Sequence, residues 1–223
     1  MADWQDNWNE PNVQGIECSR VLEALIKLGE YDGGAGKIDV ADWRKSSQHI
    51  SSKLSLSNKA SVFVVDCGSA ALPYSFIEQL LNFVVGGIDY NTPLIESVLK
   101  NIPNGTFECI EAANLDSMNR YDMVISNSVF QYFDHNYART VFSLMIVKAN
   151  VSACELDIPD DISGRKSELF HRGALSPREY DHKYTGLPHT CYQRKWFNDI
   201  ALENDLKSTW FNGGVLNHAK ISL

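Results

Sequence analysis

Two acidic residues stand at positions in this sequence from which both could bind the same ligand. Asp66 follows the apolar run 60–65 and precedes a turn of small residues, and Asp89 follows a second apolar run that begins at residue 84. Short apolar runs of this kind are typical of parallel strands that are buried on both faces. The 23 positions from one acid to the other suit one crossover helix and one further strand. Because the carboxyl ends of parallel strands meet at one edge of a sheet, we expect Asp66 and Asp89 to line one crevice, with Asp89 placed to bind a ribose diol.

The elements that must position these acids alternate along the middle of the chain. Strands are expected at residues 60–65, 84–89, 106–110, 121–126 and 151–156, and helices at 72–83, 92–100 and 137–148. Strands that are separated by helices of about a dozen residues indicate a parallel sheet with right-handed crossovers. We therefore predict the α/β class, with a doubly wound, mostly parallel, Rossmann-like sheet.

Helices and a hairpin are expected on either side of this core. They are a helix over 15–28, a helix from Asp39 as N-cap to residue 54, a helix over 195–204, and a C-terminal β-hairpin through Gly213 and Gly214 with strands at 208–211 and 216–222. We predict a single domain over 1–223. It comprises an N-terminal helical cap (1–58), a cofactor-binding core (59–159) and a substrate-side insertion with the hairpin (160–223).

The composition argues against several classes of function. A net charge of -8 opposes binding to the phosphate backbone of nucleic acids, which depends on Lys and Arg. No apolar run approaches the roughly 20 residues that a membrane-spanning helix needs, and the polar, acidic N-terminus lacks the features of a secretory signal. The five cysteines form no C-x-x-C pair and the six histidines no H-x-x-x-H pair, so we expect no metal site. We predict a cytoplasmic protein without nucleic-acid or membrane partners, and we leave a homodimer open.

The segment from residue 60 to residue 159 resembles the class I S-adenosylmethionine-dependent methyltransferases. In that family an acid-x-Gly-x-Gly-x-Gly pattern follows the first strand. Asp66 and Gly68 match it, whereas Ala70 and Leu72 stand where two further glycines are expected. The family's ribose-binding acid at the end of the second strand corresponds to Asp89, within the sequence GGIDYNTPLIESV. The resemblance covers nearly half of the chain and implies S-adenosylmethionine as the cofactor.

Two further segments extend the resemblance toward the adenine and methionine ends of that cofactor. Ile110-Glu111-Ala112 is similar to the family's third-strand segment, whose acid reaches the adenine amino group. The segment YDMVISNSVFQYF, residues 121–133, resembles the fourth strand and its following turn, which implies that Asn127 and Ser128 lie near the methionine part. The resemblance thus assigns cofactor binding to Asp66, Gly68, Ala70, Asp89, Tyr90, Glu111, Ala112, Asn127 and Ser128.

Candidates for the acceptor side of the site lie after the fourth and fifth expected strands. Methyl transfer needs an acceptor lone pair in line with the sulfonium methyl group, and a base only where the acceptor must lose a proton. His189 is the candidate base because an imidazole titrates near neutral pH, and its alternative is a loop histidine bonded to backbone. Asp157 either binds the acceptor, orients His189 or caps a turn. Gln131, Tyr132 and Tyr192 are expected to bind the substrate.

The tail of the chain is loosely similar to small bacterial methyltransferases of surface-polysaccharide or phosphorylated small-molecule pathways, through DIPD at 157–160 and REYDHKYTGLPHTCYQRKWF. The predicted function is O- or N-methylation of a small polar acceptor by S-adenosylmethionine. The alternatives are a catalytically silent binding or scaffold protein with a degenerate glycine loop, a protein methyltransferase and an NAD-dependent Rossmann enzyme. The last is disfavoured because the G-x-G-x-x-G pattern fails at Ala70 and Pro73, which leaves Gly68 alone.

Overall fold

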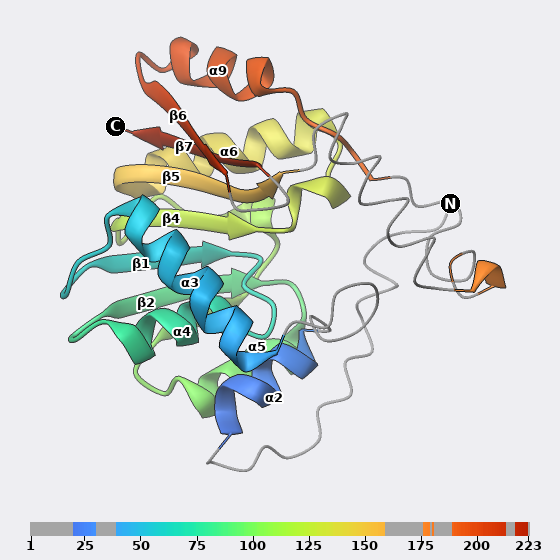
Figure 1. Ribbon diagram of the computed structural model, residues 1–223. Helices are drawn as coiled ribbons and strands as arrows, with labels where there is room; N and C mark the ends of the chain where they lie inside the picture. The colour runs from blue at the N-terminus through green and yellow to red at the C-terminus, as the bar shows by residue number, and fades with distance from the viewer. Residues whose placement is uncertain are drawn as a thin grey trace.

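The computed structural model describes residues 20–29, 39–158, 176–178, 180, 189–212 and 217–222. Its strands are β1 (Ser61–Val65), β2 (Val84–Asp89), β3 (Thr106–Cys109), β4 (Tyr121–Asn127), β5 (Ala149–Ile158), β6 (Lys207–Asn212) and β7 (Asn217–Ser222). They form a seven-stranded sheet in the order β3-β2-β1-β4-β5-β7-β6 (Figure 1). The strands β1 to β5 are parallel, whereas β7 is antiparallel to both β5 and β6. The predicted mostly parallel sheet and C-terminal hairpin are both confirmed.

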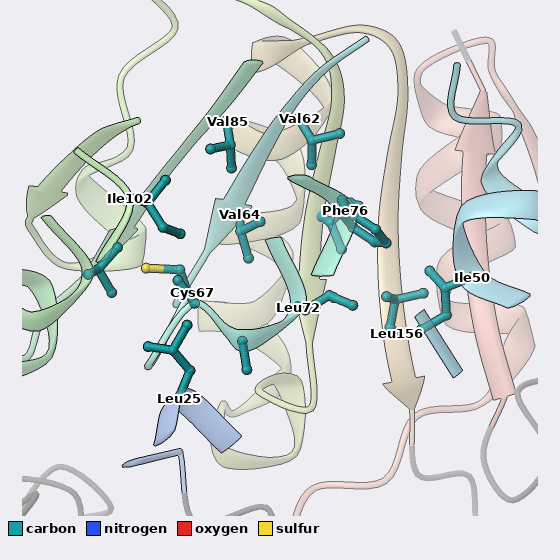
Figure 2. Packing of buried hydrophobic residues seen from close by; sticks show 14 of the residues in the cluster. Leu25, Ile50, Val62, Val64, Cys67, Leu72, Phe76, Val85, Ile102 and Leu156 are labelled. Atoms are coloured by element: carbon teal, nitrogen blue, oxygen red, sulfur yellow. The ribbon is translucent and has the colours of Figure 1, made fainter. Parts of the chain in front are cut away.

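Helices cover both faces of the sheet. They are α2 (Val21–Leu28), α3 (Val40–Leu54), α4 (Ala71–Gln79), α5 (Thr92–Asn101), α6 (His135–Lys148) and α9 (Arg194–Glu203). The first four pack into one hydrophobic cluster with Val62 and Val64 of β1 (Figure 2). The helices α6 and α9 pack into a second cluster with Phe63 and Val65. Successive β1 side chains therefore face opposite layers, as expected for a strand buried on both sides. None of the helices within the described residues is long and apolar enough to cross a membrane.

Side-chain caps decide where several of these helices begin. The Asp39 carboxylate accepts a hydrogen bond from the Asp42 N–H at 2.8 Å, which confirms Asp39 as the N-cap of α3. Asp134 accepts from the backbone N–H groups of Asn136 and Tyr137, so α6 starts two residues before the predicted position. In contrast, α4 ends at Gln79, four residues earlier than predicted, because residues 80–83 form a turn.

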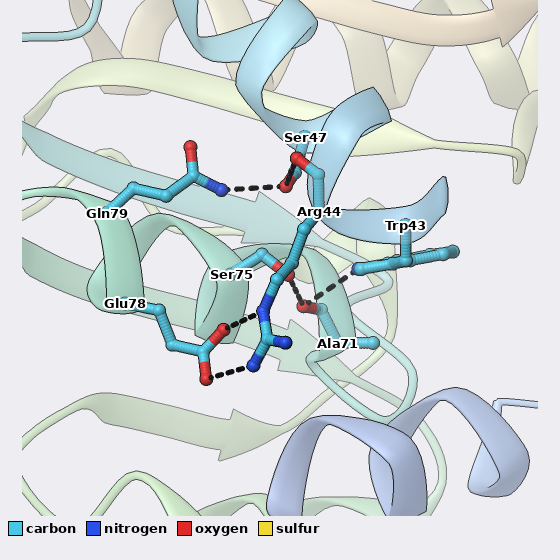
Figure 3. Close-up of polar contacts among 7 residues, drawn as sticks. All are labelled: Trp43, Arg44, Ser47, Ala71, Ser75, Glu78 and Gln79. Atoms are coloured by element: carbon cyan, nitrogen blue, oxygen red, sulfur yellow. Dashed lines mark hydrogen bonds and ion pairs between the residues drawn. The ribbon is translucent and has the colours of Figure 1, made fainter. Parts of the chain in front are cut away.

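Contacts between α3 and α4 hold the start of α4 in place (Figure 3). Trp43 donates from its indole N–H to the carbonyl of Ala71, the first residue of α4, at 3.3 Å. Arg44 forms two hydrogen bonds of 3.0 Å with the Glu78 carboxylate. The ion pair is exposed and contributes little free energy, but the buried Trp43 anchors the turn that follows β1.

Candidate functional site

Five residues with a left-handed backbone lie where the central strands end. They are Asp66, Gly68 and Ala70 after β1, Ser128 after β4, and Asp157 near the end of β5, with φ angles between 49° and 59°. This conformation costs about 1–2 kcal/mol for a residue with a side chain, and such strain concentrates at ligand-binding and catalytic sites. Because β1, β4 and β5 are adjacent and parallel, all five residues share one edge of the sheet. All five are residues that the sequence analysis assigned to the site.

The structure brings the two acids of β1 and β2 together at this edge. The Cys67 N–H donates to the Ile88 carbonyl at 2.9 Å, which extends the β1–β2 pairing past Asp66. The Asp89 carboxylate is 4% exposed and accepts hydrogen bonds from the Gly68 N–H at 2.7 Å and the Asn91 N–H at 2.9 Å. The turn after β1 is therefore tied directly to the end of β2.

Burial shifts the ionisation of both acids. It raises the pKa of Asp66 well above its ordinary value, and repulsion from Asp89 and Glu111 adds to that shift. Burial also raises the pKa of Asp89, although the N–H groups of Asn91 and Gly68 oppose this. Asp66 Oδ1 is buried without a hydrogen-bond partner among the described residues. Within the described residues, Asp66 therefore lacks a donor for Oδ1 and lies near two other carboxyl groups.

The side chains of Ala70 and Leu72, which replace two glycines of the family pattern, are buried in the core. Ala70 is 0% exposed and Leu72 is 7% exposed, and both belong to the hydrophobic cluster that includes residues of α2 and α3 (Figure 2 shows Leu72 on the side of Phe76 and Leu156). A Cβ added at Gly68 would meet no heavy atom within 4 Å. Gly68, which matches the first glycine of the family pattern, therefore has free space on the side where a side chain would stand.

The adenine side of the predicted site lies after β3. Glu111 precedes a 3₁₀ turn, η2 (Ala112–Asn114), in which Ala112 is buried, and Tyr90 directly follows Asp89. The Tyr137 hydroxyl donates to Glu111 Oε2 at 3.5 Å, and burial raises the pKa of Tyr137. The sequence analysis did not single out Tyr137. The signal that was available is the N-cap at Asp134, which places Tyr137 in the first turn of α6 and so near the edge of the sheet.

A chain of hydrogen bonds joins the ends of β4 and β5. Asn127 donates from Nδ2 to Ser128 Oγ at 3.3 Å, and Ser128 Oγ donates to Asp157 Oδ2 at 2.9 Å. The Ser128 N–H also donates to the carbonyl of Leu156 at 3.1 Å. Two predicted cofactor residues and one predicted catalytic residue are thus in contact.

The predicted base and two predicted substrate residues meet beside this chain. The Thr190 N–H donates to the Gln131 carbonyl at 2.8 Å, which fixes residues 189–190 against the turn after β4. The rings of His189 and Tyr132 pack edge to face with centroids 5.6 Å apart. Both residues retain some exposed surface. The structure therefore brings His189, Gln131 and Tyr132 together, next to the turn that follows β4.

Tyr192 lies elsewhere, in the core beneath the same turn. It is 0% exposed, and its hydroxyl lies 3.0 Å from the Phe130 carbonyl and 2.8 Å from the Phe133 carbonyl. Burial raises its pKa, with Glu155 and Asp134 adding to the shift. Because its only polar atom binds backbone, Tyr192 supports the turn from below instead of presenting a polar group to a substrate.

A buried acid on β5 was not anticipated. Glu155 is 0% exposed, and burial raises its pKa well above the ordinary value, since the Ser126 hydroxyl and the Phe130 N–H compensate too weakly. The available signal is a lone acid within an otherwise apolar strand pattern. Within the described residues, no three His, Cys, Asp or Glu side chains form a group that could hold a metal ion.

Solved structures that share this fold include several methyltransferases of distant sequence. The plantazolicin methyltransferase BpumL, in complex with S-adenosylhomocysteine, has a TM-score of 0.66 at 13% identity, over 98% of this chain and 92% of that chain. Magnesium protoporphyrin IX methyltransferase (ChlM) from Synechocystis, also with S-adenosylhomocysteine, has a TM-score of 0.59 at 13% identity, over 86% and 90%. The N-methyltransferase NodS from Bradyrhizobium japonicum has a TM-score of 0.57 at 11% identity, over 82% and 88%. No protein-family model matches the chain, and no curated protein does. The chain has the fold of the class I S-adenosylmethionine-dependent methyltransferases.

Proposed function

We propose that this protein uses S-adenosylmethionine to methylate a small polar acceptor at a nitrogen or an oxygen atom. The observation that carries the proposal is the pairing of Asp66 and Asp89 at the ends of β1 and β2, next to the free space beside Gly68. The fold supports it, because similar structures such as BpumL and ChlM were solved with S-adenosylhomocysteine bound.

The residues at this edge fit the functional groups of the cofactor. Gly68 allows a ligand to approach the backbone closely, since nothing fills the space that a side chain would take. Asp89 would accept hydrogen bonds from ribose hydroxyls, and Glu111 from the adenine amino group. Asp66 Oδ1 lacks a donor within the described part of the chain, and with Asn127 it would bind the amino-acid end of the ligand.

Catalysis would depend mainly on how these residues hold and screen the reactants. When bound, S-adenosylmethionine supplies a methyl group on a positively charged sulfur. Asp157 would bind the acceptor, and His189 would accept a proton from it. The 130–133 turn, held from below by Tyr192, would exclude water from the acceptor side. Correct positioning of this kind is worth up to about 7–11 kcal/mol of the barrier.

The packing of Ala70 and Leu72 bears on the alternative of a silent relative. Both side chains lie in the α2–α3 cluster, so neither blocks the edge where the cofactor would bind. We therefore favour a protein with an intact cofactor-binding site over a scaffold protein with a degenerate glycine loop.

Calorimetric titration with S-adenosylmethionine, S-adenosylhomocysteine and NAD tests the proposal. We expect micromolar binding of both sulfur nucleosides, which corresponds to about 8 kcal/mol, and no binding of NAD. A folded sample that binds none of the three would instead favour a silent relative. Binding of NAD alone would overturn the assignment.

The variant Asp89→Ala tests the site within the same assay. The loss of buried hydrogen bonds to the ribose should weaken S-adenosylhomocysteine binding by about 1.5–3 kcal/mol. Glu96→Ala is the matched control, because Glu96 is an exposed acid on α5. Equal affinities for the two variants would remove Asp89 from the site.

A further inference from the structure

Glu155 is a fully buried acid that the proposed function does not use. It stands on β5 between Ser126 of β4 and Ala219 of β7, and Ser126 is also fully buried. Ser126 is in turn opposite Val65 of β1, whose side chain packs in the cluster of α6 and α9. Residues that stand opposite each other in a sheet point to the same face, so Glu155 faces this cluster as well.

Two side chains on this face support the turn that follows β4. The Ser126 hydroxyl and the Phe130 N–H both act on Glu155 as hydrogen-bond donors, and each lowers its pKa. The Tyr192 hydroxyl lies 3.0 Å from the Phe130 carbonyl and 2.8 Å from the Phe133 carbonyl. Glu155 is close enough to Tyr192 to raise the pKa of the phenol. The start and the end of the turn are thus linked to β5 and to the segment that precedes α9.

The surroundings of Glu155 favour its protonated form. Neither of its carboxyl oxygens has a hydrogen bond of ordinary geometry to a described residue, and burial raises its pKa well above the ordinary value. Among the described residues, the titratable groups that face it are Asp157 on the same strand, Asp66 after β1 and Tyr192 before α9. The two acids raise its pKa further. Its neighbour on β7, Ala219, carries no charge.

The helices that cover this face present apolar side chains to the same cluster. Phe142 of α6 and Phe197 of α9 are both fully buried in it. The buried cation of α6, Lys148, is the last residue of that helix and donates hydrogen bonds to Asp116 and Met118. The cost of burying a charge at Glu155 is therefore met by keeping the proton on the carboxyl group.

A protonated carboxyl group can make the hydrogen bonds that this position offers. Its O–H donates to the Ser126 oxygen, while its carbonyl oxygen accepts the Phe130 N–H. An ionised carboxylate has no proton to donate, and a buried charge with too few donors is strongly unfavourable. Loss of the proton therefore favours a movement of the turn that brings water or other donors to the carboxylate.

The turn carries residues that are predicted to bind the cofactor and the acceptor. Asn127 and Ser128 stand at its start, and Ser128 Oγ donates to Asp157 Oδ2 at 2.9 Å. Farther along, the Gln131 carbonyl accepts the Thr190 N–H at 2.8 Å. A movement of the turn would thus displace groups on both sides of the candidate site.

From this arrangement we infer that Glu155 is a positioning residue, whose protonated carboxyl group joins Ser126 to Phe130 and so holds the 127–133 turn where it binds the cofactor. The inference rests on the proposed function and adds to it a dependence of cofactor binding on one buried proton. When that proton passes to the solvent, the turn leaves its binding position and the affinity for the cofactor falls.

Calorimetric titration with S-adenosylhomocysteine over a pH series tests this role in the parent and in Glu155→Gln. Gln keeps a donor and an acceptor but does not ionise, so its affinity at neutral pH should lie within about twofold of the parent. Above the pKa of Glu155, the parent should lose affinity relative to the variant by about tenfold for each pH unit, because only the protonated fraction binds. The ratio of the two affinities isolates Glu155, since the ligand and the other acids titrate in both experiments. A ratio that stays constant up to the highest pH at which the parent is folded would overturn the inference.

Infrared difference spectra test the proton without any ligand. A protonated carboxylic acid has a carbonyl band of its own, apart from those of carboxylates, and the difference between the parent and Glu155→Gln at neutral pH should contain it. Ser126→Ala keeps the carboxyl group and removes its partner, so the band should move to higher frequency. Glu96→Gln, at an exposed position on α5, is the control and should remove no such band.

The two measurements separate failure of the inference from failure of the proposed function. Binding of S-adenosylhomocysteine without the infrared band would overturn the positioning role of Glu155 and leave the proposed function standing. The band without binding at any pH would overturn the proposed function, and the positioning role with it.

Discussion

Replacement of Glu155 by Gln should change how the stability of this protein depends on pH. Glu155 is fully buried on β5, and burial is the main cause that raises the pKa of its carboxyl well above the ordinary value of 4.5. Asp157 and Asp66 add to the shift, while the Ser126 hydroxyl and the Phe130 N–H oppose it. Gln has nearly the same volume and hydrogen-bonding groups but does not ionise.

The sign and size of the effect follow from proton linkage. In the unfolded chain Glu155 loses its proton near pH 4.5, whereas in the folded protein it keeps that proton to higher pH. Between these two pKa values the folded state holds one proton more, so this residue lowers the free energy of unfolding by about 1.4 kcal/mol for each pH unit of increase. The slope disappears above the folded-state pKa. Asp66 and Asp89 contribute in the same direction, but they are present in both proteins.

Urea denaturation of the parent and Glu155→Gln over a pH series above 4.5 measures this difference. The free energy of unfolding of the variant should rise steadily relative to that of the parent as the pH increases, and then level off. Glu96→Gln, at an exposed position on α5, should leave the pH dependence of the parent unchanged. Parallel curves for the parent and Glu155→Gln would show that Glu155 ionises as easily in the folded state as in the unfolded state, and would refute the reasoning.

Three other substitutions separate stability from activity. Lys148→Met removes a nearly buried ammonium group that donates hydrogen bonds to Asp116 and Met118. It should lower the free energy of unfolding by about 2–3 kcal/mol in urea denaturation, and an unchanged midpoint would count against these hydrogen bonds. Tyr192→Phe removes the hydroxyl beneath the 130–133 turn and should cost about 1–2 kcal/mol of stability by the same measurement. The affinity of that variant for S-adenosylhomocysteine should stay unchanged, and a large loss would place Tyr192 in the binding site. His189→Ala should slow methyl transfer from tritiated S-adenosylmethionine by about 10²–10⁴-fold with little change in cofactor affinity, whereas equal loss of both would indicate damage to the fold.

Much of the fold could be predicted because its signals are local. The apolar runs at 60–65 and 84–89 indicate buried parallel strands, and each forms a strand within one residue of the expected bounds. The N-cap at Asp39 is likewise a contact between residues three positions apart. The position of the site at one edge follows from the same logic, since Asp66 and Asp89 come directly at the ends of neighbouring parallel strands.

The side-chain environments could not be predicted in this way. Tyr192 has the residue type of a substrate contact, yet its ring packs among Phe130, Trp196 and Phe197. Phe130 lies in the turn after β4 and the other two in α9, so these rings come together only when α9 packs against that turn. Ala70 stands where the resemblance expects a glycine, and only the tertiary structure shows that its side chain is buried in a hydrophobic cluster with residues of α2 and α3.

The sequence by itself determined the α/β class, the parallel sheet and the edge at which acidic residues gather, because hydrophobic spacing, helix caps and strand ends involve residues that are close in the chain. Only the tertiary structure decided which of those residues are exposed and which are buried. In the folded protein Ala70, Tyr192 and Glu155 are fully buried. Hydrogen bonds connect Asn127 to Ser128 and Ser128 to Asp157. The physical reason is that burial and hydrogen-bond partners depend on elements far apart in the chain, and their mutual packing leaves no mark on the local pattern.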